Sequence, residues 1–183
     1  GYTAYTDFYN EQDGTVRVFL DDTSPLRLNA SGLVQYASTD GSATVSAYDE
    51  SDITDAAALD AQLDCARLIL DAAQRAGDTD THASLYAVER SGEQTTLIFL
   101  QMYSGVPVLG DADFATFVFD GSALRTATIR LQKFQPTGGK RTVMPAKQAA
   151  AGASGAERGL MAAYRAQYGQ YVPSRFYLKN AAE

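Results

Sequence analysis

The single histidine, His82, is the residue best suited to acid–base chemistry, because only an imidazole ordinarily changes its charge near neutral pH. It follows Asp78-Thr79-Asp80-Thr81, and a neighbouring carboxylate could orient it as a general base or help it to hold a metal ion. The stretch lacks the central glycine and distal glutamate of an EF-hand loop. No serine lies in a G-x-S-x-G motif that would place a nucleophile. The sequence therefore predicts a polar loop between a helix and a strand.

Two groups of carboxylates could bind a cation or act as an acid and a base. One group precedes the longest predicted helix and the other enters a predicted strand: Asp49, Glu50, Asp52 and Asp55, and Asp111 with Asp113. Carboxylates at a helix N-terminus are favoured by the helix dipole without any ligand. Alternate residues entering a strand share one face in any exposed hairpin. We interpret both groups as structural.

A glycine-rich basic segment and a lone thiol complete the chemical candidates. The segment Thr137 to Thr142 has glycines and cations that could cradle a phosphate, but it lacks the spacing of a P-loop. Cys65 is the single cysteine, so no disulfide can form within the chain. It lies near the apolar stripe of a predicted helix and is interpreted as a packing thiol. The sequence thus predicts no catalytic residue, no cofactor-binding residue, no metal ligand and no required cofactor.

Tyrosine is abundant, with eleven residues against no tryptophan. Amphipathic rings of this kind suit protein interfaces, and they suit the polar edge of an ordinary core equally well. As an interaction surface we single out Tyr103, Tyr164 and Tyr168 from composition alone.

Composition bounds the class of protein. Of the 183 residues, 45% are hydrophobic and 20% are charged, which is typical of a globular protein. A chain of this length can bury a core without the help of a disulfide or a structural metal. The formal net charge of −7 argues against a nucleic-acid partner and against an anionic membrane surface. No apolar run approaches the roughly 18 residues of a membrane helix.

One amphipathic helix is predicted over residues 54–76. Asp52 or Thr54 can cap its start, and Gly77 can end it after Arg75 in the last turn. Apolar residues recur at three- and four-residue spacing, and acidic residues fall on the opposite face: Leu59, Leu63, Ala66, Leu70 and Ala73, against Asp60, Asp64 and Asp71. The helix should lie on a sheet with its acidic face in water.

The remaining pattern is mostly that of strands. Alternation predicts a strand at residues 16–20, a hairpin at 26–36 turning at Ala30-Ser31-Gly32, and a further strand at 43–47 after the turn signal Asp40-Gly41. Later strands are predicted at about 83–90, 93–104, 113–119 and 123–134. Residues 97–131 should form a β-meander with turns at Ser104 to Gly110 and at Asp120-Gly121.

The C-terminal part is predicted to contain helices. Pro145 fits the first turn of a short helix that continues to Ala151, and a second helix runs from Ala156 to Tyr168. Gly169 ends it, and a closing strand follows at Tyr171 to Leu178. The order predicts an α+β fold of antiparallel β-meander sheets, each packed by a helix. Two tandem sheet-plus-helix units, residues 1–80 and 81–183, and one compact domain are both compatible with it.

A resemblance to a known family appears in the second half. The segment Leu97 to Val108 (LIFLQMYSGVPV) is a strand with a Gln and a Tyr that runs into Gly-aliphatic-Pro-aliphatic. A second strand ends in Asp120-Gly121, and a later loop leads to Val143 to Ala149 (VMPAKQA), which opens a short helix. Over residues 83–180 the chain resembles the YycH/YycI family, whose units share a general likeness with PepSY-type and thermolysin-propeptide-type domains. The break at residues 152–155 and the helix predicted after it depart from that pattern.

The resemblance implies a non-catalytic regulator of a two-component system in a Gram-positive-type bacterium. It implies an extracytoplasmic domain tethered to the membrane by one helix upstream of Gly1. Its implied partners are a sensor histidine kinase and a sister YycH-like membrane protein, with control of cell-wall homeostasis as the outcome. A homodimer is also left open.

Two other functions fit the same residues. A PepSY-like or propeptide-like module would inhibit or chaperone a secreted peptidase. A hydrolase would use Asp111, Asp113 or His82, and it ranks below both because no nucleophile motif accompanies these residues.

Overall fold

The computed structural model describes residues 8–10, 16–19, 25–38, 45–49, 53–74, 81–110, 112–135, 137–138, 142–145, 147–148, 151, 158–167 and 170–179. Within these residues eleven strands form one sheet: β1 (Phe8–Asn10), β2 (Val16–Phe19), β3 (Pro25–Leu28), β4 (Leu33–Ala37), β5 (Thr81–Ser91), β6 (Gln94–Tyr103), β7 (Val106–Leu109), β8 (Ala115–Asp120), β9 (Ala123–Arg130), β10 (Arg158–Gln167) and β11 (Gln170–Lys179). The helix α1 spans Asp55–Gln74. The predicted α+β class is confirmed.

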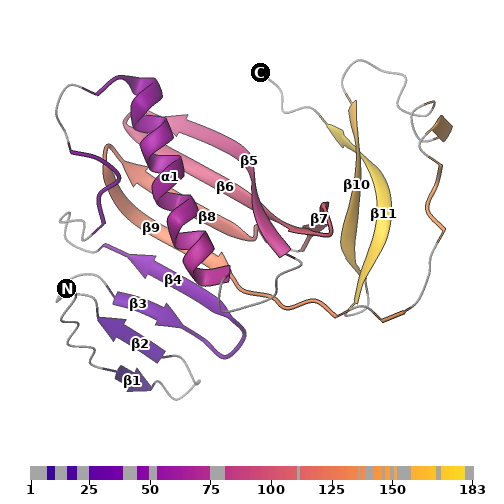
Figure 1. The fold of residues 1–183 in the computed structure, drawn as a ribbon, viewed down its shortest axis with the longest axis horizontal. Coiled ribbons are helices and arrows are strands. Elements are labelled where there is room, and N and C mark those ends of the chain that lie inside the picture. Colours follow the sequence, from indigo (N-terminus) through magenta and orange to yellow (C-terminus); the bar gives the residue numbers. More distant parts are fainter. Residues whose placement is uncertain are drawn as a thin grey trace.

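The sheet follows the order β1-β2-β3-β4-β9-β8-β6-β7-β10-β11, and β5 pairs with the other side of β6. Helix α1 crosses one face of β5, β6, β8 and β9, while β1–β4 and the β10–β11 hairpin lie at opposite ends (Figure 1). Strands that precede the predicted boundary at residues 80 and 81 and strands that follow it belong to the same sheet, because β4 pairs with β9. The division into two units stays a prediction.

Helix α1 confirms the predicted amphipathic pattern. Leu70 is 1% exposed, and Leu59 and Leu63 are partly buried against the same core. Asp60, Asp64 and Asp71 are all exposed, as predicted. Thr54 caps the helix, because its hydroxyl oxygen accepts a hydrogen bond from the Ala57 amide at 3.4 Å. The predicted end at Arg75 and Gly77 lies outside the described residues.

The core lies between α1 and the sheet. Alternate residues of β6, β8 and β9 point to the helix because side chains alternate across a strand, and the buried set includes Leu97, Phe99, Phe117, Phe119, Leu124 and Ile129. The Phe99 and Phe117 rings meet edge to face with centroids 5.8 Å apart. This arrangement holds the central strands rigidly under α1.

The first hairpin is confirmed. Strands β3 and β4 pair antiparallel, and Gly32 in their turn has φ +81°, which an L side chain rarely adopts. The turn also contacts the residue that follows β9, since the Leu131 amide donates a 2.8 Å hydrogen bond to the Gly32 carbonyl. A strand at residues 16–20 is likewise confirmed as β2, and Asp40-Gly41 lies outside the described residues.

The helix predicted from Ala156 to Tyr168 is wrong, because residues 158–167 form strand β10. Alanine-rich sequence favours a helix locally, but β10 pairs with β11 along its whole length, from Arg158↔Lys179 to Gln167↔Gln170. Long-range pairing outweighs local propensity here. The closing strand is confirmed as β11. The shorter helix after Pro145 is described only in part, at Lys147, Gln148 and Ala151.

Three strand boundaries also differ from prediction. The span predicted as a turn at Ser104 to Gly110 contains β7, and the turn itself is Ser104-Gly105. Strand β9 ends at Arg130 rather than at residue 134, because its neighbour β4 begins opposite that residue. The strand predicted at 43–47 is, in its described part, the single bridge Ser46↔Ala123. The predicted meander is confirmed for β6, β8 and β9, which pair antiparallel in that order. The additional strand β7 pairs with β6 and follows β8 along the same side of it.

Candidate functional site

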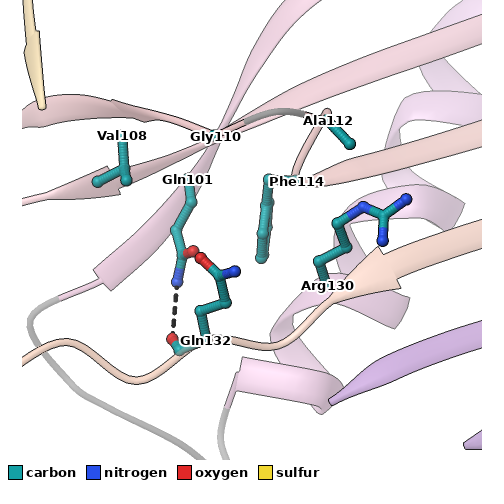
Figure 2. A pocket seen from close by; sticks show the side chains of 7 residues that line it. All are labelled: Gln101, Val108, Gly110, Ala112, Phe114, Arg130 and Gln132. Atoms are coloured by element: carbon teal, nitrogen blue, oxygen red, sulfur yellow. Dashed lines mark hydrogen bonds between the residues drawn. The ribbon is translucent and has the colours of Figure 1, made fainter. Parts of the chain in front are cut away.

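A pocket of about 220 Å³ lies where strand β6 changes its pairing partner from β8 to β7. Strand β6 pairs with β8 through residues 94–99 and with β7 through residues 101–103, so β7 and β8 follow one another along one side of β6. The connection between them borders the pocket. Its lining comes from β6, β7, that connection and the end of β9: Gln101, Val108, Gly110, Ala112, Phe114, Arg130 and Gln132 (Figure 2).

Arg130 supplies the positive charge of this pocket. It is the last residue of β9, and its own amide donates a 2.8 Å hydrogen bond to the Phe114 carbonyl. Its side-chain Nε is buried and has no hydrogen-bond partner. In the described part of the chain no carboxylate oxygen lies within ion-pair distance of its guanidinium. The pocket therefore holds a partly buried cation whose donor is unsatisfied.

Two amides form the other polar wall. Gln101 is 4% exposed, and its Nε2 donates a 3.1 Å hydrogen bond to the main-chain carbonyl of Gln132. That bond fixes the Gln101 amide with its oxygen turned the other way. Figure 2 shows both glutamine side chains on one side of the Phe114 ring and the Arg130 guanidinium on the other. The pocket thus has two polar ends separated by an aromatic surface.

An aromatic cluster adjoins the pocket through strand pairing. Val108 is paired with Gln101 on one side and with Tyr164 on the other. The Tyr103 ring meets the rings of Phe134 and Tyr164, with centroids 5.9 and 6.0 Å apart. The structure therefore brings together two of the three tyrosines singled out from the sequence, both half-buried. Tyr168 lies outside the described residues.

The outer side of β5 is a second surface of interest. Among the described strands, β5 pairs only with β6, so its other side is an edge of the sheet. A register shift between Leu85 and Ala87 leaves Tyr86 without a partner across the strand pair. Three large apolar side chains of this strand are exposed: Leu85 at 37%, Tyr86 at 52% and Val88 at 38%. An edge strand with such residues is a template for pairing with another chain.

A wider hollow of about 590 Å³ opens at the start of α1. Gln62 lines it, and its Nε2 donates a 2.8 Å hydrogen bond to the Gly121 carbonyl while its buried Oε1 has no partner. The charged groups around this hollow have both signs, Asp55 and Glu93 beside Arg90. Arg90 donates to the main-chain carbonyl of Asp55 at 3.4 Å. The mixed charge selects no single class of ligand.

The chemical candidates from the sequence are not gathered into one site. His82 is exposed on the edge strand β5, opposite Met102, while Asp78 and Asp80 lie outside the described residues. Asp113 is exposed, and Asp111 lies outside the described residues.

The acidic group before α1 is described only at Asp49 and Asp55, both exposed. Glu50 and Asp52 lie outside the described residues, as do residues 139–141 of the glycine-rich segment. Within the part of the chain that the structure describes, no group of three or more His, Cys, Asp or Glu is placed to hold a metal ion.

Cys65 is half-buried on α1. Desolvation by burial raises the pKa of its thiol above the ordinary value, which keeps it in the weakly nucleophilic protonated form. This environment agrees with the interpretation of Cys65 as a packing residue.

Among the described residues, no helix combines the length and apolar character that crossing a bilayer requires.

Sequence reasoning missed the pocket and the exposed edge. Arg130 and Gln132 lie in the strand predicted at residues 123–134, and nothing in their spacing links them to Gln101. A scan of protein-family models and a search of curated proteins each gave no match to this chain.

Proposed function

We propose that this chain is a non-catalytic interaction domain that regulates a sensor histidine kinase outside the cytoplasm, as its resemblance to the YycH/YycI family suggests. The observation that carries the proposal is the unpaired side of β5, with Leu85, Tyr86 and Val88 exposed. The partner would be an extended segment of the kinase's extracytoplasmic part or of a sister YycH-like protein.

Strand addition supplies the binding energy in this proposal. An extended segment that pairs with β5 gains main-chain hydrogen bonds, and pockets for alternate side chains give specificity. Burial of the exposed apolar side chains of β5 adds a hydrophobic contribution to this pairing. The register shift at Tyr86 in the β5–β6 pair is a bulge, and a bulge bends its strand and increases the local twist, so a partner strand on β5 would have to match that bend.

Photo-crosslinking in cells that carry the protein tests this directly. We expect p-benzoylphenylalanine in place of Tyr86 to crosslink to the extracytoplasmic part of a sensor histidine kinase or to its sister protein. The matched control places the same group at Leu68, which is 70% exposed but belongs to α1 rather than to the β5 edge. Equal crosslinking from both positions would overturn the assignment of the β5 edge.

A double substitution that places two negative charges on β5 provides the second measurement. Leu85→Glu with Val88→Glu should abolish the Tyr86 crosslink because a charged edge disfavours strand pairing. Leu68→Glu should leave it intact. Circular dichroism and thermal unfolding establish that each variant is folded before crosslinking is compared. A secreted peptidase as the crosslinked partner would replace the kinase-regulator proposal with the PepSY-like or propeptide-like one.

A further inference from the structure

Two hairpin turns determine which main-chain groups of β5 point to its free edge. Both turns have two residues, Gly92-Glu93 between β5 and β6 and Ser104-Gly105 between β6 and β7. The residues that flank such a turn form a hydrogen-bonded pair. In this sheet those pairs are Ser91↔Gln94 and Tyr103↔Val106. Along an antiparallel strand the main-chain groups then point alternately to one side and to the other.

The two turns agree on the residues of β5 that face outward. Counted back from the first turn, the main chains of Arg90 and Val88 point away from β6. Counted from the second turn through β6, the main chains of Leu85 and Ala83 do so as well. Among the described residues, none of these four main chains has a hydrogen bond on the outer side of β5. The edge therefore presents four residues whose main chains are open to a further strand.

Tyr86 makes the spacing of these residues irregular. The register shift between Leu85 and Ala87 inserts one residue, so the outward-facing residues 83, 85, 88 and 90 are separated by two, three and two positions. A regular strand presents outward groups at every second residue, so it matches only the half of β5 before Tyr86 or the half after it. The spacing reads the same in both directions along the chain. A second β5 strand that runs antiparallel to the first therefore matches all four positions.

The side chains of the edge match in the same register. Leu85 lies opposite Phe99 and Val88 lies opposite Leu97, so both are on the sheet face that α1 covers. Their side chains are nevertheless 37% and 38% exposed. In the antiparallel arrangement of two copies, Leu85 of each copy lies opposite Val88 of the other. Four exposed apolar side chains then meet on one face, where cross-strand pairs stabilise a sheet.

We propose that two copies of this chain form a two-fold symmetric dimer in which their β5 strands pair antiparallel and join the two sheets. The two-fold axis passes beside Tyr86. Leu85 of one copy pairs with Val88 of the other, and Ala83 of one copy pairs with Arg90 of the other. A two-fold interface uses the same patch of both copies, so the dimer occupies both β5 edges and closes without forming a filament.

The dimer goes beyond the proposed function and does not depend on it. The kinase segment of the proposed function would need the same edge of β5, so the dimer and the kinase would compete for it. Self-association would then lower the amount of chain that is available to the kinase. This last consequence rests on the proposed function, whereas the dimer itself does not.

Sedimentation of the isolated chain over a range of concentrations tests for the dimer without any other protein. We expect a reversible equilibrium between monomer and dimer. Leu85→Glu with Val88→Glu should raise the dissociation constant of the dimer by about tenfold or more, because like charges then lie opposite each other at both pairs. A monomer at every concentration would overturn the proposal.

A charge-swapped variant is the matched control for this loss. Leu85→Lys with Val88→Glu removes the same two apolar side chains but places opposite charges across both pairs. It should therefore dimerise more tightly than Leu85→Glu with Val88→Glu. Circular dichroism and thermal unfolding establish that both variants are folded. Equal dissociation constants of the two folded variants would contradict the proposed register.

Spin labels on the otherwise native edge measure the register directly and do not require the charged variants to fold. In a Cys65→Ala background, a single label is placed at His82, at Ser91 or at Glu89, which are all exposed. His82 and Ser91 are equally far from the proposed axis on opposite sides of it. Their labels should therefore give equal separations between copies, about 30 Å at about 3.3 Å per residue, and Glu89 should give about half of that distance. Unequal separations from His82 and Ser91 would overturn the assigned pairing.

The dimer and the proposed function can fail separately. If the isolated chain stays monomeric while Tyr86 crosslinks to a sensor histidine kinase in cells, the dimer is wrong and the proposed function stands. If the isolated chain dimerises in the assigned register while Tyr86 crosslinks only to a second copy, the dimer stands and the kinase is not the partner of β5.

Discussion

Tyr103 of β6 and Tyr164 of β10 meet edge to face with ring centroids 6.0 Å apart, although they are distant in sequence. This contact lies beside a short parallel pairing, Tyr164↔Val108 and Arg165↔Leu109, through which β10 joins the rest of the sheet. Edge-to-face aromatic pairs contribute free energy beyond the area they bury. The ring contact therefore helps to hold the β10–β11 hairpin against β7.

Replacing Tyr103 with Leu should loosen that hairpin. We expect the free energy of unfolding to fall by about 0.5–1.5 kcal/mol for each lost ring contact. Hydrogen exchange should quicken in β10 more than in β8, and Tyr103→Phe should preserve most of the native protection because it retains the ring. Equal acceleration in both strands would show that the contact has no special role in holding the hairpin.

Leu70→Ala should be strongly destabilising. Leu70 is 1% exposed between α1 and the sheet, and a leucine truncated in such a place leaves a cavity that costs about 2–5 kcal/mol. The control is Leu68→Ala on the same helix, where the side chain is 70% exposed and the expected change is within about 0.5 kcal/mol. Denaturant unfolding measures both, and similar losses would contradict the assigned core face.

Gly32→Ala should destabilise the protein more than Gly92→Ala. Both glycines have positive φ, at +81° and +61°, so each substitution carries a backbone penalty of roughly 1–2 kcal/mol. At Gly32 an added Cβ would also lie 2.3 Å from the Leu131 carbonyl oxygen, whereas at Gly92 nothing lies within 4 Å. Unfolding midpoints of the two variants measure the difference. Equal midpoints would contradict the close approach of the hairpin turn to Leu131.

Tyr36→Phe should leave stability unchanged or raise it. The Tyr36 ring is buried in the core, and its hydroxyl oxygen is buried without a hydrogen-bond partner. Removing an unsatisfied polar group removes its desolvation cost, of about 1–3 kcal/mol. Tyr86→Phe, at an exposed ring, serves as the neutral control in the same thermal unfolding experiment. A clear loss of stability for Tyr36→Phe alone would reveal a partner for that hydroxyl.

Cys65 should react slowly with thiol reagents at neutral pH. Desolvation raises the pKa of its thiol, so the thiolate fraction is smaller than that of an exposed cysteine. The raised pKa also favours the protonated folded state: that contribution to stability is present below the pKa of the unfolded thiol and is lost as pH rises through the folded pKa. Reaction with a chromogenic disulfide, followed against pH in native and unfolded protein, measures both effects. Equal rates in the two states would contradict the burial.

Elements with a strong local period were predicted well from sequence. The stripe around Leu70 and the turn at Gly32 follow from helix periodicity and glycine conformation, which are local properties. The prediction of a helix at residues 158–167 is wrong because the secondary structure of this segment depends on pairing with β11 and β7, which no local pattern encodes. The pocket likewise depends on long-range strand pairing. Gln101 and Arg130 become neighbours of one cavity only because β7 and β8 share a side of β6.

The pairing of β4 with β9 determines the order in which the chain can complete its fold during synthesis. Residues 33–37 leave the ribosome long before residues 126–130, their partners on that side. Until then the apolar side chains of Leu26, Val34 and Tyr36 lack the sheet against which they pack in the finished protein. Closing so long a loop carries an entropic cost and slows folding. A chain that has not yet made residues 126–130 therefore leaves the apolar side of this hairpin exposed, and such surface is prone to aggregation.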